Sequence, residues 1–377
     1  MANTLNIGFI GGGLNSAIGQ THKIASEMDG HFRLVSGCFS RDSVVNTQTA
    51  LRWGVQPERV YATSSDFIKG ESTRLDAVVI LLPIPDHFDI VIACLSAGLA
   101  VICEKALVDT SMSAKQIDEW LREHGGQLYV TYNYSGYPMV RELQQRIING
   151  EFGVIQQVMV EMPQESFVRQ NTLGQVSKPQ IWRQHDGEIP TMSLDLGVHA
   201  HQLVSFLTHD RPADVYAIAS HFTELPGIID TVHAIARYES GMVCNYWYGK
   251  SALGYRNGLR IRLMGTQGSA EWLQMDPEVI NVSDVLGRKF TLDRTCTENQ
   301  IANLPRYARF KAGHPAGFIE AFANYYADIA LALQGKENRY TCGTETAFEG
   351  LQFLENIHLS ARMQQKIICK EPVHELS

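Results

Sequence analysis

The sequence predicts an α/β protein with two domains: a doubly wound parallel sheet over residues 1–132, and an α/β domain with a large, mostly antiparallel open sheet over residues 133–377. Three observations support this fold class. Strand-like and helix-like patterns alternate up to residue 132, a glycine-rich turn follows the first strand pattern, and strand patterns follow one another in the second half. A length of 377 residues agrees with two domains.

Six apolar runs in the first domain are expected to be strands buried on both faces, because they are nearly continuous in Val, Ile, Leu and aromatic residues. Helix patterns lie between most of them, as in strand–helix–strand units. The strands are expected at 5–10, 32–39, 59–63, 75–82, 99–104 and 127–132, and the helices at 18–28, 43–54, 87–98 and 113–125.

The second domain is expected to mix helices with consecutive strands. A polar stretch from Pro163 to Pro190 is too long for a plain connection and contains Trp182 and Arg183, which favours a functional role. Helices are expected at 139–150, 193–207, about 315–334 and 344–365, and strands at 154–162, 214–222, 232–239, 242–249, 259–266 and 269–275.

Composition and charge argue against two classes of partner. The chain has 32 lysine and arginine residues against 40 acidic residues, a formal charge of −8. A nucleic-acid binder needs a clustered positive surface, and docking on anionic membranes needs basic segments, so neither partner is expected. No apolar run reaches the ~18 residues of a membrane helix, and a first strand at residue 5 leaves no room for a secretory signal.

The seven cysteines are scattered and form no CxxC pair. In a chain of this length that pattern argues against a disulfide framework and against a structural zinc site. We therefore expect a reduced, cytoplasmic protein without a bound metal.

The turn after the first strand has the composition of a dinucleotide-binding loop. Three glycines (11–13) follow the strand and Gly19 begins the next helix, a spacing three residues longer than G-x-G-x-x-G. The first glycine is expected to permit the tight turn, and the third to let a pyrophosphate approach the helix N-terminus. Asn15 and Ser16 add side-chain donors. A purely structural turn remains open, although the place after the first buried strand favours a nucleotide.

The end of the second strand bears on the choice of cofactor. Ser40 stands where a carboxylate would bind the ribose hydroxyls of NAD. Arg41 could bind a 2′-phosphate or stack on adenine, which slightly favours NADP, whereas Asp42 could still reach the ribose. A simple solvated turn is the alternative interpretation.

Two short motifs suggest acid–base chemistry. Glu104 and Lys105 follow a buried strand, where doubly wound sheets bind ligands, and the lysine could place its ammonium on a substrate oxygen or simply extend into solvent. Asp195 and His199 are four residues apart and would share one helical face, as a carboxylate–imidazole pair requires. Taken alone, the second motif is more often a capping aspartate with a core histidine. His201 would lie on another face from His199, so the two do not indicate a metal site.

Together these motifs resemble the glucose–fructose oxidoreductase / inositol dehydrogenase family, or Gfo/Idh/MocA family, over nearly the whole chain. The combination of EK with DxGxH about 90 residues later is specific. The resemblance rests on IGGG…IGQTHKIA, LPIPDHFDIVIACLSAGLAVICEKALV, YNYSGYPMVREL, WR at 182–183, DLGVHAHQL, IRLMGTQGSAEW and GHPAGFIEAFANYYADI.

The resemblance implies a Rossmann domain that binds NAD or NADP, a sugar, glycoside or cyclitol substrate between the domains, and a homodimer or homotetramer formed through the open sheet. Lys105, Asp195 and His199 match the family's catalytic residues. Expected cofactor-binding residues are Gly11, Gly13, Asn15, Ser16, Ile18, Ser40, Arg41, Leu82, Pro83, His87, Glu104, Lys105, Asn133, Trp182 and Arg183. Expected substrate-binding residues are Lys105, Tyr134, Tyr137, Arg183, Asp195, His199 and His314.

Three departures from the family pattern concern the cofactor and the substrate. Ala106 replaces the proline of EKP, so the proline's restraint on the next turn is lost. The usual TPN reads Leu82-Pro83-Ile84, which removes two polar contacts to the cofactor, although His87 remains. Gln202 replaces the last aspartate of DxGxHxxD and is expected to be structural or to face the substrate.

The expected reaction is reversible oxidation of a secondary alcohol. His199, paired with Asp195, would take the hydroxyl proton, and Lys105 would hold the same oxygen. Three alternatives remain open at this point: redox-neutral cleavage or epimerisation of a glycoside through a keto sugar, a ligand sensor without catalysis, and a dehydrogenase of nucleotide-linked sugars.

Overall fold

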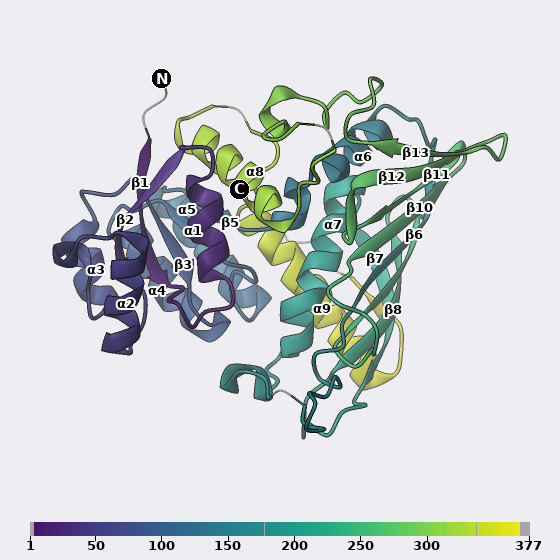
Figure 1. The fold of residues 1–377 in the computed structure, drawn as a ribbon. Coiled ribbons are helices and arrows are strands. Elements are labelled where there is room, and N and C mark those ends of the chain that lie inside the picture. The colour runs from purple at the N-terminus through teal and green to yellow at the C-terminus, as the bar shows by residue number, and fades with distance from the viewer. Residues whose placement is uncertain (1–3, 177, 312, 337, 370–377) are drawn as a thin grey trace. The chain divides into compact units, whose positions relative to one another are not determined.

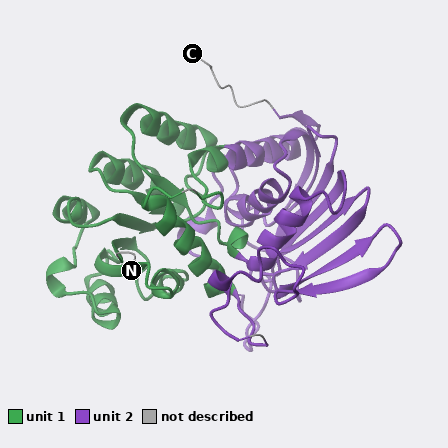
Figure 2. Ribbon diagram, turned by 90° about the horizontal axis from the view of Figure 1, so that it is seen from above, with its two compact units in different colours: residues 1–136, 318–348 green, residues 137–317, 349–377 purple. Residues whose placement is uncertain are grey.

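The structure is a computed structural model that describes residues 4–176, 178–311, 313–336 and 338–369. The chain divides into two compact units, coloured separately in Figure 2. The first contains residues 1–136 and 318–348, and the second contains residues 137–317 and 349–377.

The first unit is built on a five-stranded sheet in which every neighbouring pair is parallel. Its central strand β3 is buried over its whole length, because side chains from helices cover both faces. The predicted doubly wound sheet is confirmed (Figure 1). In the order β2-β1-β3-β4-β5, the strands are β2 (Phe32–Cys38), β1 (Leu5–Gly11), β3 (Ala77–Leu81), β4 (Val101–Cys103) and β5 (Leu128–Val130).

One helix of the first unit comes from late in the sequence. Helix α8 (Phe318–Leu333) packs against α1 and against the short 3-10 turn Asn133–Gly136. The sequence predicts this helix but does not reveal that the chain returns to the first sheet. The other helices of the unit are α1 (Gly19–Glu27), α2 (Ser43–Trp53), α3 (Ser64–Glu71), α4 (His87–Ser96) and α5 (Ser111–His124).

The prediction of a strand at 59–63 is wrong. In this stretch only Val60 forms a bridge, to Gly37 beside it. Pro57–Arg59 form a 3-10 turn, and Thr63 already caps α3 by accepting a hydrogen bond from the Asp66 N–H. Too few residues remain between the turn and the cap for a strand, and α3 itself was not predicted.

The second unit contains a nine-stranded sheet in which, among the described strands, β6 and β9 form the one parallel pair. The prediction of a large, mostly antiparallel sheet is therefore confirmed. Strands β12 and β13 were not predicted, because their residues are largely polar and β13 is mostly exposed. In sheet order the strands are β13 (Lys289–Asp293), β12 (Asp276–Asp284), β11 (Gly268–Leu273), β10 (Arg260–Gly265), β6 (Ile155–Pro163), β9 (Val243–Gly249), β8 (Thr231–Tyr238), β7 (Pro212–Ser220) and β14 (Ile367–Ile368).

Helices cover one face of this sheet and leave the other open (Figure 1). They are α6 (Pro138–Ile148), α7 (Val198–Thr208) and α9 (Thr344–Met363), the last of which begins in the first unit. Strand β8 shows the alternation that results: Val232 and Ala234 are buried, while His233 and Ile235 are exposed. Throughout the described residues, every helix is too short or too polar to span a lipid bilayer.

A buried ion pair connects the stretch that was expected to be a strand to the end of α3. Glu71 is fully buried at the end of α3 and accepts hydrogen bonds from Arg59 Nε at 2.9 Å and from the Tyr61 hydroxyl at 3.0 Å. Burial alone would raise the pKa of Glu71, but the bonds from Arg59 and Tyr61 more than offset it, so the pKa lies below its usual value.

We predict that Glu71→Gln lowers the free energy of unfolding at pH 7 by about 3 kcal/mol, because it leaves a largely buried arginine without its carboxylate. A carboxyl with a lowered folded pKa adds stability above its unfolded pKa and loses it as the pH falls through the folded pKa. The loss measured by urea denaturation should therefore shrink toward acid pH. The exposed Glu119→Gln, which breaks only a 3.7 Å pair with Lys115, should cost less than about 1 kcal/mol. A loss for Glu71→Gln that does not change with pH would contradict the prediction.

Candidate active site

The predicted ligand-binding residues of the first unit follow the carboxyl ends of the parallel strands. Because all five strands run in the same direction, these ends share one edge of the sheet. The structure places Gly11, Gly13, Asn15, Ser16 and Ile18 at or after the end of β1, Ser40 and Arg41 after β2, Leu82, Pro83 and His87 after β3, Glu104 and Lys105 after β4, and Asn133 and Tyr134 after β5.

The glycine loop absorbs its extra residues in a turn. The Ser16 N–H donates to the Gly13 carbonyl at 2.7 Å, which closes the turn before α1 begins. The glycines that need their conformation are Gly11 and Gly12, with φ of +84° and +76°. A Cβ at Gly19 would lie 1.7 Å from the Gly12 carbonyl oxygen. The close approach of loop and helix thus involves Gly12 and Gly19, whereas sequence reasoning assigned special roles to the first and third glycines.

The loop and its surroundings fit the pyrophosphate and amide groups of a nicotinamide dinucleotide. Helix α1 begins without an acidic residue in its first turn, so its positive dipole end favours an anion. The Ser16 hydroxyl accepts hydrogen bonds from the Ile18 and Gly19 N–H groups at 3.3 Å. After β5, the side-chain nitrogen of Asn133 is buried and makes no hydrogen bond within the described residues. A buried donor of this kind normally has a partner, and a bound amide would supply one.

The acidic residue after β2, Asp42, is bound to the helix that follows it. Asp42 caps α2 by accepting hydrogen bonds from the Val44 and Val45 N–H groups at 2.8 and 3.1 Å. The Ser40 hydroxyl accepts from the Asp42 N–H at 3.1 Å. Arg41 is largely exposed and forms a 3.0 Å ion pair with Asp86. The carboxylate that could have reached a ribose is therefore committed to the helix cap.

His87 is fully buried and holds two turns together. Its Nε2 lies 2.9 Å from the Leu82 carbonyl, and its Nδ1 lies 3.0 Å from the Leu107 carbonyl and 3.1 Å from that of Ala106. Burial lowers the pKa of His87, against the opposing effect of these carbonyls. Both ring nitrogens face the main chain, so this residue fixes the loops around the predicted site.

Glu104 is buried beside Lys105 at the end of β4. Its Oε1 lies 3.0 Å from His22 Nε2 and also accepts a hydrogen bond from the Thr131 hydroxyl. Burial alone would raise the pKa of Glu104, but the bond from His22, the charge of Lys105 and the bond from Thr131 hold it below its usual value. The carboxylate is therefore ionised at neutral pH. The peptide bond between Lys105 and Ala106 is cis.

In the second unit, Asp195 lies in a π-helical turn. The sequence predicts one regular helix over 193–207, with Asp195 and His199 on one face. Instead, Ser193–Gly197 form a π-turn and the α-helix α7 begins at Val198. The Ser193 hydroxyl bonds the Tyr248 hydroxyl at 2.9 Å. A π-turn contains one more residue per turn, so the i, i+4 relation of a regular α-helix does not apply here.

The carboxylate of Asp195 is held by two cations. Arg183 Nη1 and Lys250 Nζ both donate to its Oδ2. Lys250 is almost completely buried, directly after β9, and its ammonium lies 5.3 Å from the centre of the Phe167 ring. Sequence reasoning missed Lys250, although a lysine directly after the aromatic strand pattern 242–249 was a usable signal. It did single out Arg183, and the structure brings Arg183 to Asp195.

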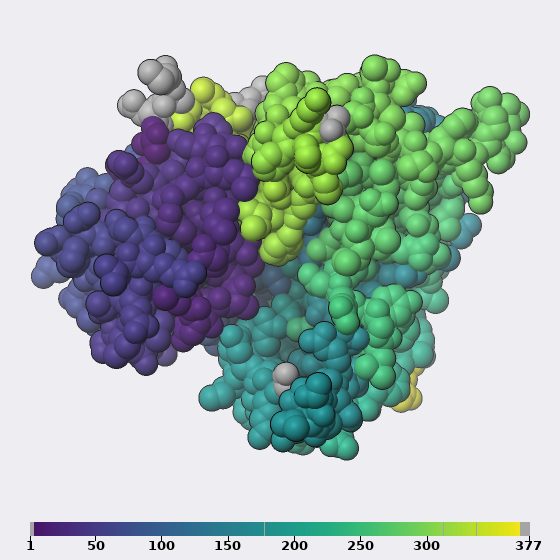
Figure 3. Space-filling view, in the orientation of Figure 1, coloured from purple at the N-terminus to yellow at the C-terminus, as the bar shows by residue number. Residues whose placement is uncertain are grey.

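The remaining predicted residues have mixed surroundings. Trp182 lies in the polar stretch 163–190, most of which is exposed on the surface of the second unit (Figure 3, teal), and the Arg183 guanidinium lies 4.6 Å from its ring centre. Tyr137 is buried and packs on Trp272 with 5.2 Å between ring centres, and Tyr134 is buried in the first unit. His314 is exposed.

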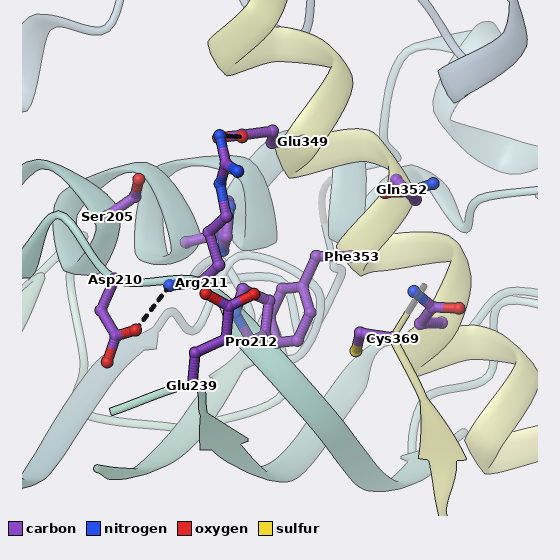
Figure 4. A pocket seen from close by; sticks show the side chains of 11 residues that line it. Ser205, Asp210, Arg211, Pro212, Glu239, Glu349, Gln352, Phe353 and Cys369 are labelled. Atoms are coloured by element: carbon purple, nitrogen blue, oxygen red, sulfur yellow. Dashed lines mark hydrogen bonds and ion pairs between the residues drawn. The ribbon is translucent and has the colours of Figure 1, made fainter. Parts of the chain in front are cut away.

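A small cavity in the second unit lies at the end of α7, between α9 and β14 (Figure 4). The side chain of Arg211 forms an ion pair with Glu349 across it at 2.8 Å. His201, which also lines it, is buried against Phe353, and burial lowers the pKa of its imidazole to about 4. The lining contains none of the residues predicted to bind the cofactor or substrate.

Comparisons with known proteins agree with this arrangement. Residues 5–132 match the oxidoreductase family with an NAD-binding Rossmann fold, and residues 140–271 match the GFO/IDH/MocA C-terminal domain. An uncharacterised oxidoreductase of Bacillus subtilis, YfiI, is 27% identical over 96% of this chain and 95% of its own length.

Two solved structures are similar over nearly the full length. An inositol dehydrogenase homologue from Azotobacter vinelandii, solved with NADH and myo-inositol, has a TM-score of 0.88 and 25% identity over 98% of both chains. An oxidoreductase from Sinorhizobium meliloti has a TM-score of 0.85 and 27% identity over 97% of this chain and 99% of that one. The chain therefore belongs to the Gfo/Idh/MocA family of oxidoreductases with an NAD-binding Rossmann fold.

Proposed function

We propose that this protein is an NAD(P)-dependent dehydrogenase that acts on a secondary alcohol of a sugar, a glycoside or a cyclitol. The observation that carries the proposal is Lys105, which follows an ionised, buried Glu104 at the same sheet edge as a glycine loop that fits a dinucleotide. The similarity to an inositol dehydrogenase homologue that was solved with NADH and myo-inositol supports this substrate class.

The cofactor would be held by the first unit. The glycine loop and the N-terminus of α1 would bind the pyrophosphate, and Asn133 would donate to an amide. Ser40 and Arg41 would meet the adenosine end, and the commitment of Asp42 to the α2 cap supports NADP over NAD. When bound, the nicotinamide supplies the hydride acceptor for oxidation and the hydride donor for reduction.

The catalytic roles are assigned from the chemistry of the residues. A ring nitrogen of His199 would accept the proton of the substrate hydroxyl during oxidation and return it during reduction. The negative charge of Asp195, held by Arg183 and Lys250, would favour the imidazolium that forms. The ammonium of Lys105 would donate to the same substrate oxygen and stabilise its developing negative charge. Arg183, Tyr134, Tyr137 and His314 would bind the rest of the polyol.

A binding and absorbance screen tests this proposal. The purified protein is titrated with NAD and NADP by thermal shift, and each dinucleotide is then tested with a panel of inositols, hexoses and glycosides. The proposal expects a shift with one dinucleotide and new absorbance of reduced nicotinamide with at least one polyol. Tight dinucleotide binding without reduction by any polyol would overturn it, and a keto intermediate without net reduction would favour redox-neutral glycoside chemistry.

The proposal also covers the cellular location and the oligomeric state. No disulfide links the cysteines of the described residues, which supports a reduced, cytoplasmic location. The open face of the large sheet exposes Tyr216, Ile218 and Ile235 on adjacent strands, with 43%, 55% and 54% of their surface accessible. An apolar patch of this kind on a sheet face supports association with a second copy of the chain, as a homodimer or homotetramer.

We predict that Lys105→Ala lowers turnover by about a thousandfold, because one donor to a developing oxyanion is lost. Thermal shift should show dinucleotide binding close to that of the wild type. Lys115→Ala, on the exposed side of α5, is the matched control and should retain full turnover. Near wild-type turnover of Lys105→Ala would remove the lysine from the mechanism.

We predict that Lys250→Met lowers kcat/KM for the alcohol by at least about tenfold, because Asp195 then keeps only one of its two cations. The affinity for the dinucleotide should not change, since the glycine loop belongs to the other unit. Lys366→Met, which breaks an exposed 3.4 Å pair with Asp214 in the same unit, should leave kcat/KM unchanged. Equal effects of the two substitutions would argue against a role for Lys250.

We predict that the double substitution Ile218→Glu and Ile235→Glu converts the oligomer to a monomer, because buried charges on the sheet face would have no partner. Light scattering coupled to size-exclusion chromatography measures the mass. Leu51→Glu, at an exposed position on α2, should leave the mass unchanged. An oligomer that survives the double substitution would show that another surface mediates association.

A further inference from the structure

A fully buried histidine connects three elements of the first unit. His22 lies on α1, with Nε2 3.0 Å from Glu104 Oε1 at the end of β4 and Nδ1 2.7 Å from the Tyr326 hydroxyl on α8. Its ring also packs edge-on against Phe322 and Tyr326, at 4.9 and 5.8 Å between ring centres. The histidine thus joins the helix that follows the glycine loop to the glutamate next to Lys105.

The charge state of Glu104 fixes the direction of the hydrogen bonds. An ionised carboxylate can only accept, so Nε2 of His22 carries a proton and donates to it. In the tautomer that carries its proton on Nε2, Nδ1 accepts from the Tyr326 hydroxyl, whose proton is retained because burial raises the pKa of Tyr326. The result is an ordered series from Tyr326 through His22 to Glu104.

The groups around Glu104 explain why its carboxylate needs a hydrogen-bond donor such as His22. Six titratable side chains surround the Glu104 carboxylate. Helices α1 and α8 contribute His22 and Tyr326, and strand β4 and the loops contribute Lys105, Cys103, Tyr132 and His87. Burial raises the pKa values of Cys103, Tyr132 and Tyr326 and lowers that of His87, so these four are neutral at pH 7. A buried carboxylate in such surroundings needs strong donors to stay ionised.

We propose that His22 and Tyr326 are positioning residues that keep Glu104 ionised and in one orientation beside Lys105. His22 is the donor that touches the carboxylate, and Tyr326 fixes the histidine tautomer that can donate. Because His22 belongs to α1, the same contact ties the helix of the glycine loop to the strand end that carries the lysine. The consequence for Lys105 rests on the proposed function, whereas the pairing with Glu104 does not.

Kinetics over a range of pH test the catalytic consequence. The assay uses the reduction direction, in which a protonated His199 is required, so the loss of activity toward acid pH is left to the carboxylates Glu104 and Asp195. Of these two, Glu104 is the one that His22 contacts. His22→Leu should lower kcat about tenfold and move the acid limb of kcat to higher pH by about one unit, because burial of Glu104 is then offset only by Lys105 and Thr131. Tyr326→Phe should move the limb in the same direction by a smaller amount.

Two controls separate positioning from packing. His22→Gln can place an amide N–H near the position of Nε2, so it should restore both kcat and the acid limb to near wild-type values. Tyr325→Phe removes a neighbouring hydroxyl of α8 that bonds Val130 and Cys342 and does not contact His22, so it should leave the acid limb in place. An acid limb that does not move in His22→Leu or Tyr326→Phe would overturn the proposal.

A double-mutant cycle tests the pairing without any substrate. Unfolding by urea is measured for His22→Leu, Glu104→Gln and the double variant. Glu104→Gln keeps the size of the side chain, so packing alone predicts additive losses, whereas the proposed pairing predicts a coupling of at least about tenfold in the unfolding equilibrium constant. Additive losses would refute the pairing. If no polyol is reduced by the wild type, the dehydrogenase proposal fails while this cycle still decides the role of His22.

Discussion

The constraint on which the candidate site depends is the common direction of the five strands in the first sheet. Since every pair in β2-β1-β3-β4-β5 is parallel, each strand delivers its following loop to the same edge. Residues as distant in sequence as the glycine loop, Glu104 and Asn133 are gathered there by this direction alone. The buried strands can carry little polar chemistry themselves, so the loops after them supply it.

Carboxylates that are buried or only slightly exposed recur in both units with assigned donors. Glu71 is held by Arg59 and Tyr61, Glu104 by His22 and Thr131, and Asp195 by Arg183 and Lys250. Removing a carboxylate from water is costly, so each one requires donors at fixed positions. Glu71 connects a turn to α3, Glu104 places a charge next to Lys105, and Asp195 brings Arg183 and Lys250 to one carboxylate.

The sequence alone predicts the features of the fold that depend on local hydrophobic patterns. Buried parallel strands, the alternating strands of the second sheet and the residues after strand ends follow from hydrophobic periodicity and from the direction rule. It does not predict the features that depend on contacts between residues distant in the sequence. Residues 59–63 form no strand, and Arg59 and Tyr61 bind Glu71 instead. Helix α8 returns to the first unit, where Tyr326 bonds His22, and the π-turn at Asp195 lies where Ser193 bonds Tyr248. Lys250 follows a predicted strand, and its contact with Asp195 is what indicates a role for it.

Two of the departures from the family pattern, Leu82 and Ala106, lie next to the side chain of His87. Leu82 and Ala106 stand at two positions where the family usually has other residues, and the carbonyls of both lie within 3.1 Å of a ring nitrogen of His87. Main-chain carbonyls are present whatever the side chain, so the turns after β3 and β4 remain joined although the usual side chains are absent. The fixed backbone at Lys105 therefore does not require the missing proline. These departures alter the side chains that follow β3 and β4, whereas the proposed choice between NAD and NADP depends on the surroundings of Ser40 and Arg41 at the end of β2.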